Sequence, residues 1–133
     1  MGMVMTTVYV VETGYYSDRF VLGAYLSMGG VADALARHWP GEVSIRAFDK
    51  ERIIEGGSNL YVMNYYREID WRDSSEEAIT LCSLPDFQPI DPIVCVRDKP
   101  EYVPDITVVG SDESQVRETF NDTLAAEATK RGW

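Results

Sequence analysis

The segment Thr6–Tyr25 constrains the fold most, because it predicts two strands joined by a short polar turn. Its first run, Thr6–Thr13, is rich in Thr, Val and Tyr, whose branched and aromatic side chains pack well on a pleated surface. Both faces of this run are apolar, which indicates a central strand. The second run, Arg19–Leu26, contains Gly23, and a glycine inside a strand predicts a bulge or a close backbone approach. The two runs therefore predict an antiparallel hairpin closed by the loop 14–18.

A short helix is expected directly after this hairpin. Ser27 is a suitable N-cap for a helix over Met28–Trp39, and Pro40 with Gly41 ends it. Apolar residues recur along this segment at the spacing of one helical face. Two glycines in its first turn weaken it by about 1 kcal/mol each relative to Ala.

The C-terminal part of the chain predicts a longer helix. Ser111 is the expected N-cap of a helix over Asp112–Arg131, with Gly132 at the C′ position. Acidic residues at its start and basic residues at its end suit the helix dipole. Every fourth residue is apolar, in the stripe Val116, Phe120, Leu124 and Ala128. This stripe predicts that the helix lies against a sheet or against a second copy of the protein.

Short apolar runs between the helices predict further strands. We expect them at Val43–Phe48, Ile53–Ile54, Leu60–Ile69, Ala78–Leu84, Ile93–Arg97 and Ile106–Val109. The strand from Leu60 is apolar on both faces, with Tyr61 on one and Val62 on the other. The connection Glu55–Asn59 contains two glycines and is the expected mobile loop. Together these elements predict an α+β protein, a mainly antiparallel sheet with two amphipathic helices packed on it.

Length and charge narrow the function classes. The 133 residues suit a single domain over 1–133, with residues 1–5 as a loose N-terminus. A net charge of −10 argues against direct binding to nucleic acid, whose affinity rests on Lys and Arg, and against an anionic membrane surface. The acidic balance either serves solubility or complements a basic partner, and DNA mimicry is one form of such complementarity. Mimicry requires charges ranked along one face, whereas these carboxylates are scattered, with one local group at Asp70, Asp73, Glu76 and Glu77.

The sequence contains no standard catalytic or metal-binding constellation. His38 is the only histidine, so a Ser-His-Asp or Cys-His unit would depend on it alone. Cys82 and Cys95 fit no CxxC redox or zinc pattern, and small buried hydrophobic side chains are their default role. The acidic group at 70–77 lacks the glycine and the ligand spacing of a calcium loop. We therefore expect no catalytic residue, no metal and no cofactor.

The chain has many aromatic residues for its length. Tyr15 and Tyr16 fall in the predicted turn, beside Asp18 and Arg19. Exposed aromatic side chains next to charged ones are typical of interfaces and of ligand cradles, so these four residues form the candidate binding site. The competing interpretation is local, with Asp18 bonding turn amides and the tyrosines covering the end of the sheet.

The same hairpin residues carry a resemblance to a known group of proteins. Glu12–Arg19, ETGYYSDR, followed by Gly23–Ser27, GAYLS, resembles a family of small accessory proteins of bacteriophages, of the actinobacteriophage type. The C-terminal stretch, from Gly110–Glu113 to Arg131–Trp133, is similar to the end of many such proteins. The pair Gly29–Gly30 departs from the family, which usually has good helix formers there. The resemblance implies no established catalytic activity, and it implies a phage gene product that acts in the cytoplasm of the bacterial host.

The leading hypothesis is a phage accessory protein that acts without catalysis, by binding a protein of the host or of the phage. The alternative is a protein that binds or sequesters a small molecule such as a signalling nucleotide, which would require aromatic faces and an arginine such as Arg19, Arg46 or Arg67. The third hypothesis is a DNA-mimic inhibitor or a small enzyme, a hydrolase or transferase. Association into a homo-oligomer stays open.

Overall fold

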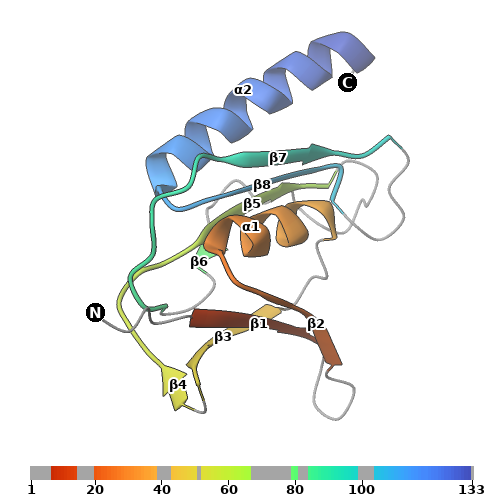
Figure 1. Cartoon of the computed structure of the whole chain (residues 1–133). Helices are drawn as coiled ribbons and strands as arrows, with labels where there is room; N and C mark the ends of the chain where they lie inside the picture. Colours follow the sequence, from red (N-terminus) through yellow and green to blue (C-terminus); the bar gives the residue numbers. More distant parts are fainter. Residues whose placement is uncertain are drawn as a thin grey trace.

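The computed structural model describes residues 7–14, 20–38, 43–50, 52–66, 79–80, 84–98 and 104–132. In chain order its elements are β1 (Thr7–Thr13), β2 (Phe20–Tyr25), α1 (Met28–Arg37), β3 (Val43–Asp49), β4 (Arg52–Ile54), β5 (Tyr61–Tyr65), β6 (Ile79–Thr80), β7 (Ile93–Val96), β8 (Ile106–Gly110) and α2 (Glu113–Arg131). Every strand pair in these described ranges is antiparallel. The predicted α+β class is confirmed, and the strands divide between two sheets of four (Figure 1).

β1 lies in the interior of the first sheet, whose strand order is β2-β1-β3-β4. Tyr9, Val11 and Thr13 are buried on one side of this sheet, because alternate residues of a strand point to opposite faces. Ile45 and Ala47 of β3 are buried on the same side. The prediction that the first strand is a central one is confirmed.

β2 contains the irregularity predicted at Gly23. Its pairing with β1 shifts between Val11 and Glu12, so that Gly23 lies opposite Val11 and Val21 lies opposite Glu12. The extra residue between them makes a β-bulge, which bends the strand. A Cβ atom at Gly23 would collide with the ring of Tyr25, so the glycine also makes room for a close contact.

The second sheet has the order β6-β5-β8-β7, and all five residues of β8 are buried. β5 pairs with β8 along its whole length, from Tyr61 opposite Gly110 to Tyr65 opposite Ile106. The two faces of β5 contribute to two separate hydrophobic cores, the larger one through Val62 and the smaller one through Met63, between Tyr61 and Tyr65. The predicted apolar character of both faces is confirmed, and each face has its own partner.

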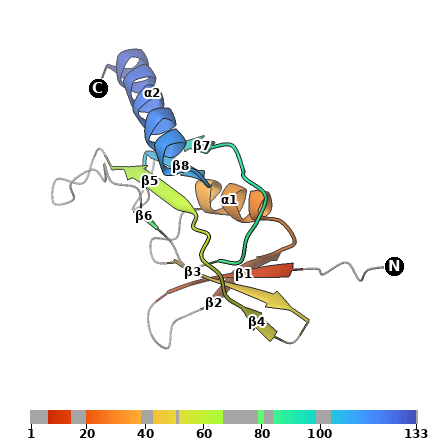
Figure 2. The ribbon, with the colours of Figure 1, turned by 90° about the vertical axis from the view of Figure 1, so that its left-hand side faces the viewer.

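The sheets and helices form four layers. α1 lies between the two sheets, because its buried Val31 and Leu35 share the larger core with Val11 of β1 and Val109 of β8. α2 lies on the opposite face of the second sheet, where its Phe120 belongs to the smaller core. The first sheet and α2 are therefore at opposite ends of the molecule in both views (Figures 1 and 2).

The start of α1 agrees with the prediction. The hydroxyl oxygen of Ser27 accepts a 3.1 Å hydrogen bond from the backbone N–H of Gly30, which makes Ser27 the N-cap. The helix ends at Arg37, with His38 as its C-cap, whereas the predicted end, Trp39, lies outside the described residues.

The start of α2 differs from the prediction by one residue. Asp112, not Ser111, is the N-cap, and its carboxylate accepts a 2.9 Å hydrogen bond from the backbone N–H of Gln115. An Asp at this position also suits the positive end of the helix dipole. Ser111 is engaged elsewhere, since its hydroxyl bonds the backbone of Ile90. Gly132 takes the predicted left-handed C-terminal position, with φ of 70°.

The glycine-rich connection after β4 is tied to a distant segment, in contrast to the mobile loop expected there. Ser58 and Leu84 exchange two backbone hydrogen bonds of 2.9 and 2.8 Å, and the Ser58 hydroxyl donates a 2.7 Å bond to Asp86. A Cβ atom at Gly56 would collide with the backbone of Leu84. Within the described residues, the strand expected over 78–84 is reduced to β6 and this single bridge.

Candidate functional site

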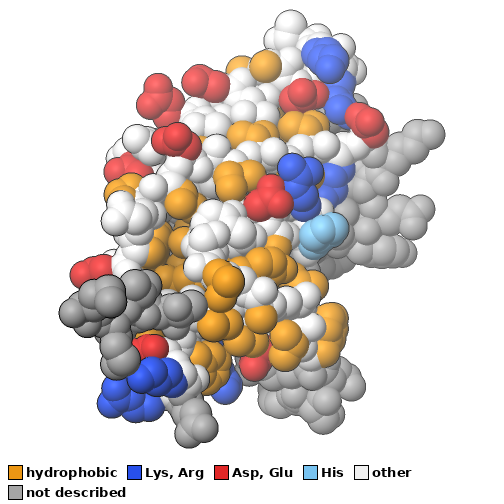
Figure 3. All heavy atoms as spheres, in the orientation of Figure 1, with side chains coloured by type: hydrophobic (Ala, Val, Ile, Leu, Met, Phe, Trp, Pro, Cys, Tyr) orange, Lys and Arg blue, Asp and Glu red, His pale blue; other side chains and the backbone are white. Residues whose placement is uncertain are grey.

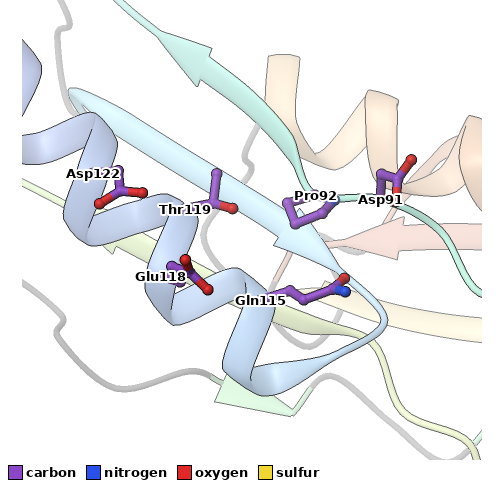
Figure 4. Close-up of a pocket in the computed structure, with 6 residues that line it drawn as sticks. All are labelled: Asp91, Pro92, Gln115, Glu118, Thr119 and Asp122. Carbon is purple, nitrogen blue, oxygen red and sulfur yellow. The ribbon is translucent and has the colours of Figure 1, made fainter.

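An open groove of about 330 Å³ lies between α2 and the segment that leads into β7. Its lining residues are Asp91, Pro92, Gln115, Glu118, Thr119 and Asp122 (Figure 4). The four from α2 are spaced at i, i+3, i+4 and i+7, so they share one helical face. This face is different from the one that buries Val116 and Phe120 against the second sheet. We call this hollow the α2 groove.

The position of the α2 groove is set by two small residues at the end of β8. A Cβ atom at Gly110 would lie 2.8 Å from Cγ2 of Val116 and 3.4 Å from Cα of Pro92, so only glycine lets the helix and the segment approach this closely. The hydroxyl of Ser111 then accepts a 2.9 Å hydrogen bond from the N–H of Ile90 and donates a 3.1 Å bond to its carbonyl oxygen. Together these contacts fix the segment 90–92 beside the first turns of α2.

The α2 groove is acidic. Asp91, Glu118 and Asp122 are all exposed, and none of the described residues that line the groove is basic. Glu118 and Asp122 are four residues apart on the helix, where like charges repel and destabilise it slightly. Figure 3 shows acidic side chains over the first turns of α2. The groove therefore presents carboxylate oxygens to solvent, and a cationic group would relieve their repulsion.

With the described residues alone, the carboxylates of the α2 groove do not make up a metal site. Among the described residues, no group of three or more His, Cys, Asp or Glu side chains is close enough to hold a metal ion. This concerns only the part of the chain that the structure describes, and the acidic group predicted at Asp70, Asp73, Glu76 and Glu77 lies outside it.

A second hollow, of about 200 Å³, lies on the first sheet and is lined by Glu12, Phe20, Val21 and Arg46. The Arg46 guanidinium is 3.9 Å from the Glu12 carboxylate. Phe20 and Val21, adjacent in β2, are 58% and 57% exposed, so they present apolar surface at this hollow. Hydrophobic side chains gather over β1 and β2 in Figure 3.

The predicted binding turn adjoins this second hollow in the sequence. Its residues Tyr15, Tyr16, Asp18 and Arg19 lie outside the described residues, and Phe20 follows them directly. Of the three arginines proposed for an anionic ligand, Arg46 lines the second hollow, while Arg19 and Arg67 lie outside the described residues.

A polar network at the end of the second sheet was not predicted from the sequence. Arg97 donates hydrogen bonds from Nη1 to the Pro104 carbonyl oxygen at 3.0 Å and to the Thr107 hydroxyl at 3.1 Å, and from Nη2 to the Ala36 carbonyl oxygen at 2.6 Å. The Thr107 hydroxyl in turn donates a 2.9 Å bond to the side-chain oxygen of buried Asn64. The sequence feature that could have indicated this network is one polar residue inside each of two apolar strands, Asn64 in β5 and Thr107 in β8. Because these groups bond one another, the network positions α1 and is not an open site.

The last turn of α2 is held by ion pairs. Arg131 donates 2.7 Å hydrogen bonds to Glu127 on the same helix and to Asp98 beside β7. The hydrogen bond to Glu127, followed by that to Asp98, raises the pKa of Arg131 above its usual value. Arg97 and Asp98, adjacent in the chain, thus bond the C-terminal turns of both helices.

His38, the sole histidine, and Cys95 form no catalytic arrangement with other residues that the structure describes. His38 is exposed at the C-cap of α1, and its backbone N–H bonds the Ala34 carbonyl oxygen at 2.9 Å. Cys95 is a free, half-buried thiol that packs against the larger core. Cys82 lies outside the described residues.

Comparisons of this chain with known proteins found no similar protein. No protein-family model matches the chain, and neither the curated proteins nor the solved structures include a match. In the described part of the chain, neither helix combines the length and the apolar character needed to cross a membrane.

Proposed function

We propose that this protein is a phage accessory protein that acts in the host cytoplasm, without catalysis, by binding a protein of the host or of the phage. The α2 groove is the surface to which we assign this binding, and its partner is a segment rich in Lys or Arg. The phage assignment rests on the resemblance of the hairpin residues, and the binding assignment rests on the groove.

The acidic lining of the α2 groove is the observation that carries the proposal. Asp91, Glu118 and Asp122 line one open hollow from two segments of the chain, with Asp91 beside Pro92 and the other two on α2 (Figure 4). Ionised carboxylates form strong, charge-assisted hydrogen bonds with Lys and Arg side chains. An open groove gives such long side chains access without requiring the molecule to change shape.

Small-molecule binding receives less support from these hollows. Pockets for drug-sized ligands are mostly apolar and enclose about 300–1,000 Å³. The α2 groove has this size, but its carboxylates would repel phosphate groups. The second hollow provides an aromatic ring, Phe20, and an arginine, Arg46, but it measures only about 200 Å³ and places Glu12 beside the arginine.

The proposal is tested by neutralising the α2 groove. In the groove variant, Asp91→Asn, Glu118→Gln and Asp122→Asn keep the side-chain shapes and remove three negative charges. The tagged parent captures partners from host lysate, and the affinity of each purified partner is then measured for parent and variant. We expect the groove variant to weaken binding by tenfold or more and to reduce its dependence on salt, because fewer charges are paired.

A matched control separates the groove from general acidity. Asp33→Asn, Asp49→Asn and Glu55→Gln remove the same number of charges from other elements and should leave the affinity nearly unchanged. Equal losses in the two triple variants would show that net charge, rather than the α2 groove, attracts the partner. A partner that binds both variants as tightly as the parent would place the binding surface elsewhere.

A further inference from the structure

The outward side of the first sheet is a nine-residue surface, which we call the outer face. Cross-strand pairing places its side chains in three rows: Val21, Glu12 and Ser44; Ala24, Val10 and Arg46; Val8, Phe48 and Ile53. Side chains directly opposite one another in antiparallel strands share a face, so the three rows form one continuous surface.

The outer face is mainly apolar and is not covered by any described element. Six of its nine side chains are hydrophobic, and Val21 and Ile53 are each 57% exposed. In the described part of the chain, α1 packs on the first sheet from the other side, through the core that contains Tyr9 and Val11. Of the other apolar side chains of the outer face, Val8, Val10 and Phe48 are half-buried, so it exposes apolar surface chiefly at Val21, Ala24 and Ile53. Exposed apolar surface on an uncovered sheet face is typical of interaction sites.

The charges of the outer face favour a second copy of this chain as its partner. Glu12 and Arg46 are its two charged residues, and they lie 3.9 Å apart. The outer face is therefore neutral on a chain whose net charge is −10. When two such faces stack about a two-fold axis, Glu12 of each copy can lie opposite Arg46 of the other, so the surface is complementary to itself.

The arrangement of the layers lets two acidic molecules meet in this way. The acidic α2 groove is at the opposite end of the molecule from the first sheet (Figures 1 and 2). Stacked sheets lie about 10 Å apart, and repulsion between more distant charges is screened within a Debye length of about 8 Å at physiological salt. Contact through the outer faces therefore keeps the groove carboxylates of the two copies far from each other.

We propose that two copies of this chain form a weak, two-fold symmetric dimer through their outer faces, with Glu12 and Arg46 exchanged between the copies. The strands are about 4.8 Å apart; three are about 20 Å long and the three-residue β4 is about 10 Å long, so the outer face presents roughly 350 Å² per copy. This is less than the approximately 800 Å² of a standard stable interface. The dimer should therefore dissociate on dilution. Each dimer would present two α2 grooves, but the proposal does not depend on what they bind.

Sedimentation velocity of the full chain, from about 10 µM to about 1 mM, tests this dimer, since weak interfaces have dissociation constants in that range. We expect the mean sedimentation coefficient to rise from the monomer value toward that of a dimer. Added NaCl should strengthen the association, because it screens the repulsion between two molecules of charge −10 more than a buried ion pair.

Charge exchange identifies the interface. Glu12→Arg alone and Arg46→Glu alone each place like charges at both exchanged positions, and each should weaken the dimer by tenfold or more. An equimolar mixture of these two variants should recover association, because the opposite charges then face each other in a mixed dimer. Ile53→Lys, at an exposed position where folding should be unaffected, should also weaken the dimer, while the groove variant should associate at least as well as the parent.

The proposal is overturned if the parent stays monomeric over the whole range, which would leave the outer face to a different protein. It is equally overturned if a dimer forms but persists in Glu12→Arg, Arg46→Glu and Ile53→Lys, or if the mixture of the two charge variants fails to recover. If the groove variant loses partner binding but still dimerises, then partner binding by the α2 groove and dimerisation through the outer face are independent of each other.

Discussion

Arg97, directly after β7, donates a 2.6 Å hydrogen bond to the backbone carbonyl oxygen of Ala36 in the last turn of α1. Carbonyl groups at the end of a helix have no partner within the helix, and a cation there also suits the negative end of the dipole. The same guanidinium bonds the Thr107 hydroxyl of β8. One side chain therefore fixes α1 against the second sheet.

Removing this guanidinium should destabilise the protein. Arg97→Met keeps the aliphatic stem but leaves the Ala36 carbonyl and the Thr107 hydroxyl short of a donor, so we expect the free energy of unfolding to fall by about 2–3 kcal/mol. Urea unfolding measures the change. Arg37→Met is the control, because Arg37 makes one exposed ion pair with Asp33 and should change stability by less than about 1 kcal/mol. Equal effects of the two substitutions would contradict the role of Arg97.

Phe120 should be the most costly position of α2 to truncate. It is fully buried in the smaller core, with Met63 and Val116 among its neighbours in that cluster. Phe120→Ala should lower the free energy of unfolding by about 3–5 kcal/mol, a large share of the total for a domain of this size. Leu124→Ala, at a half-buried position of the same stripe, should cost less. A Phe120→Ala variant that melts like the parent would show that α2 does not pack on the sheet in this way.

Two adjacent glycines should respond in opposite ways to the same substitution. A Cβ atom at Gly56 would collide with the backbone of Leu84 and Pro85, while a Cβ atom at Gly57 would meet no atom within 4 Å. Gly56→Ala should therefore lower the melting temperature, because backbone must shift. Gly57→Ala should leave it unchanged or raise it, with a gain of up to about 1 kcal/mol from the reduced entropy of the unfolded chain. Equal melting temperatures for the two variants would contradict the close approach at Gly56.

Tyr9 should make the protein less stable at alkaline pH. Burial raises the pKa of the Tyr9 hydroxyl above its ordinary value of 10.0. The folded state then holds this proton more tightly than the unfolded state, so its contribution to stability is complete below pH 10 and is lost as pH rises through the folded-state pKa. Tyr9→Phe cannot ionise and should lose less stability above pH 10 in urea unfolding series at several pH values. Identical alkaline losses in parent and variant would exclude Tyr9 as their source.

The candidate site shows where sequence reasoning reaches its limit. The carboxylates of the α2 groove come from two segments, with Asp91 far from Glu118 and Asp122 in the sequence, so the acidic residues looked scattered. Their placement along one groove depends on Gly110 and Ser111, which bring the segment before β7 against α2. The predicted turn Tyr15–Arg19 lies outside the described residues, and its binding role stays a prediction.

The sequence by itself determined the elements of this protein. The Thr-, Val- and Tyr-rich run Thr6–Thr13 specified β1, the apolar run Val43–Phe48 specified β3, and the four-residue repeat specified the face of α2 that buries Phe120. These patterns are local, because each depends only on the geometry of one strand or one helix. For the same reason Gly23 predicted a bulge or a close backbone approach before any partner strand was known, and the structure has the bulge.

Only the tertiary structure decided how these elements assemble. The division of the strands into two sheets, with α1 between them, depends on contacts between residues far apart in the chain, such as Val11 with Val109 in one core. The same long-range packing leaves the outer face uncovered by any described element and brings Arg97 to the end of α1. The local periodicity of a strand or helix shows which of its sides is apolar. Which distant surface buries that side depends on how all the elements pack together, so it is decided by the tertiary structure.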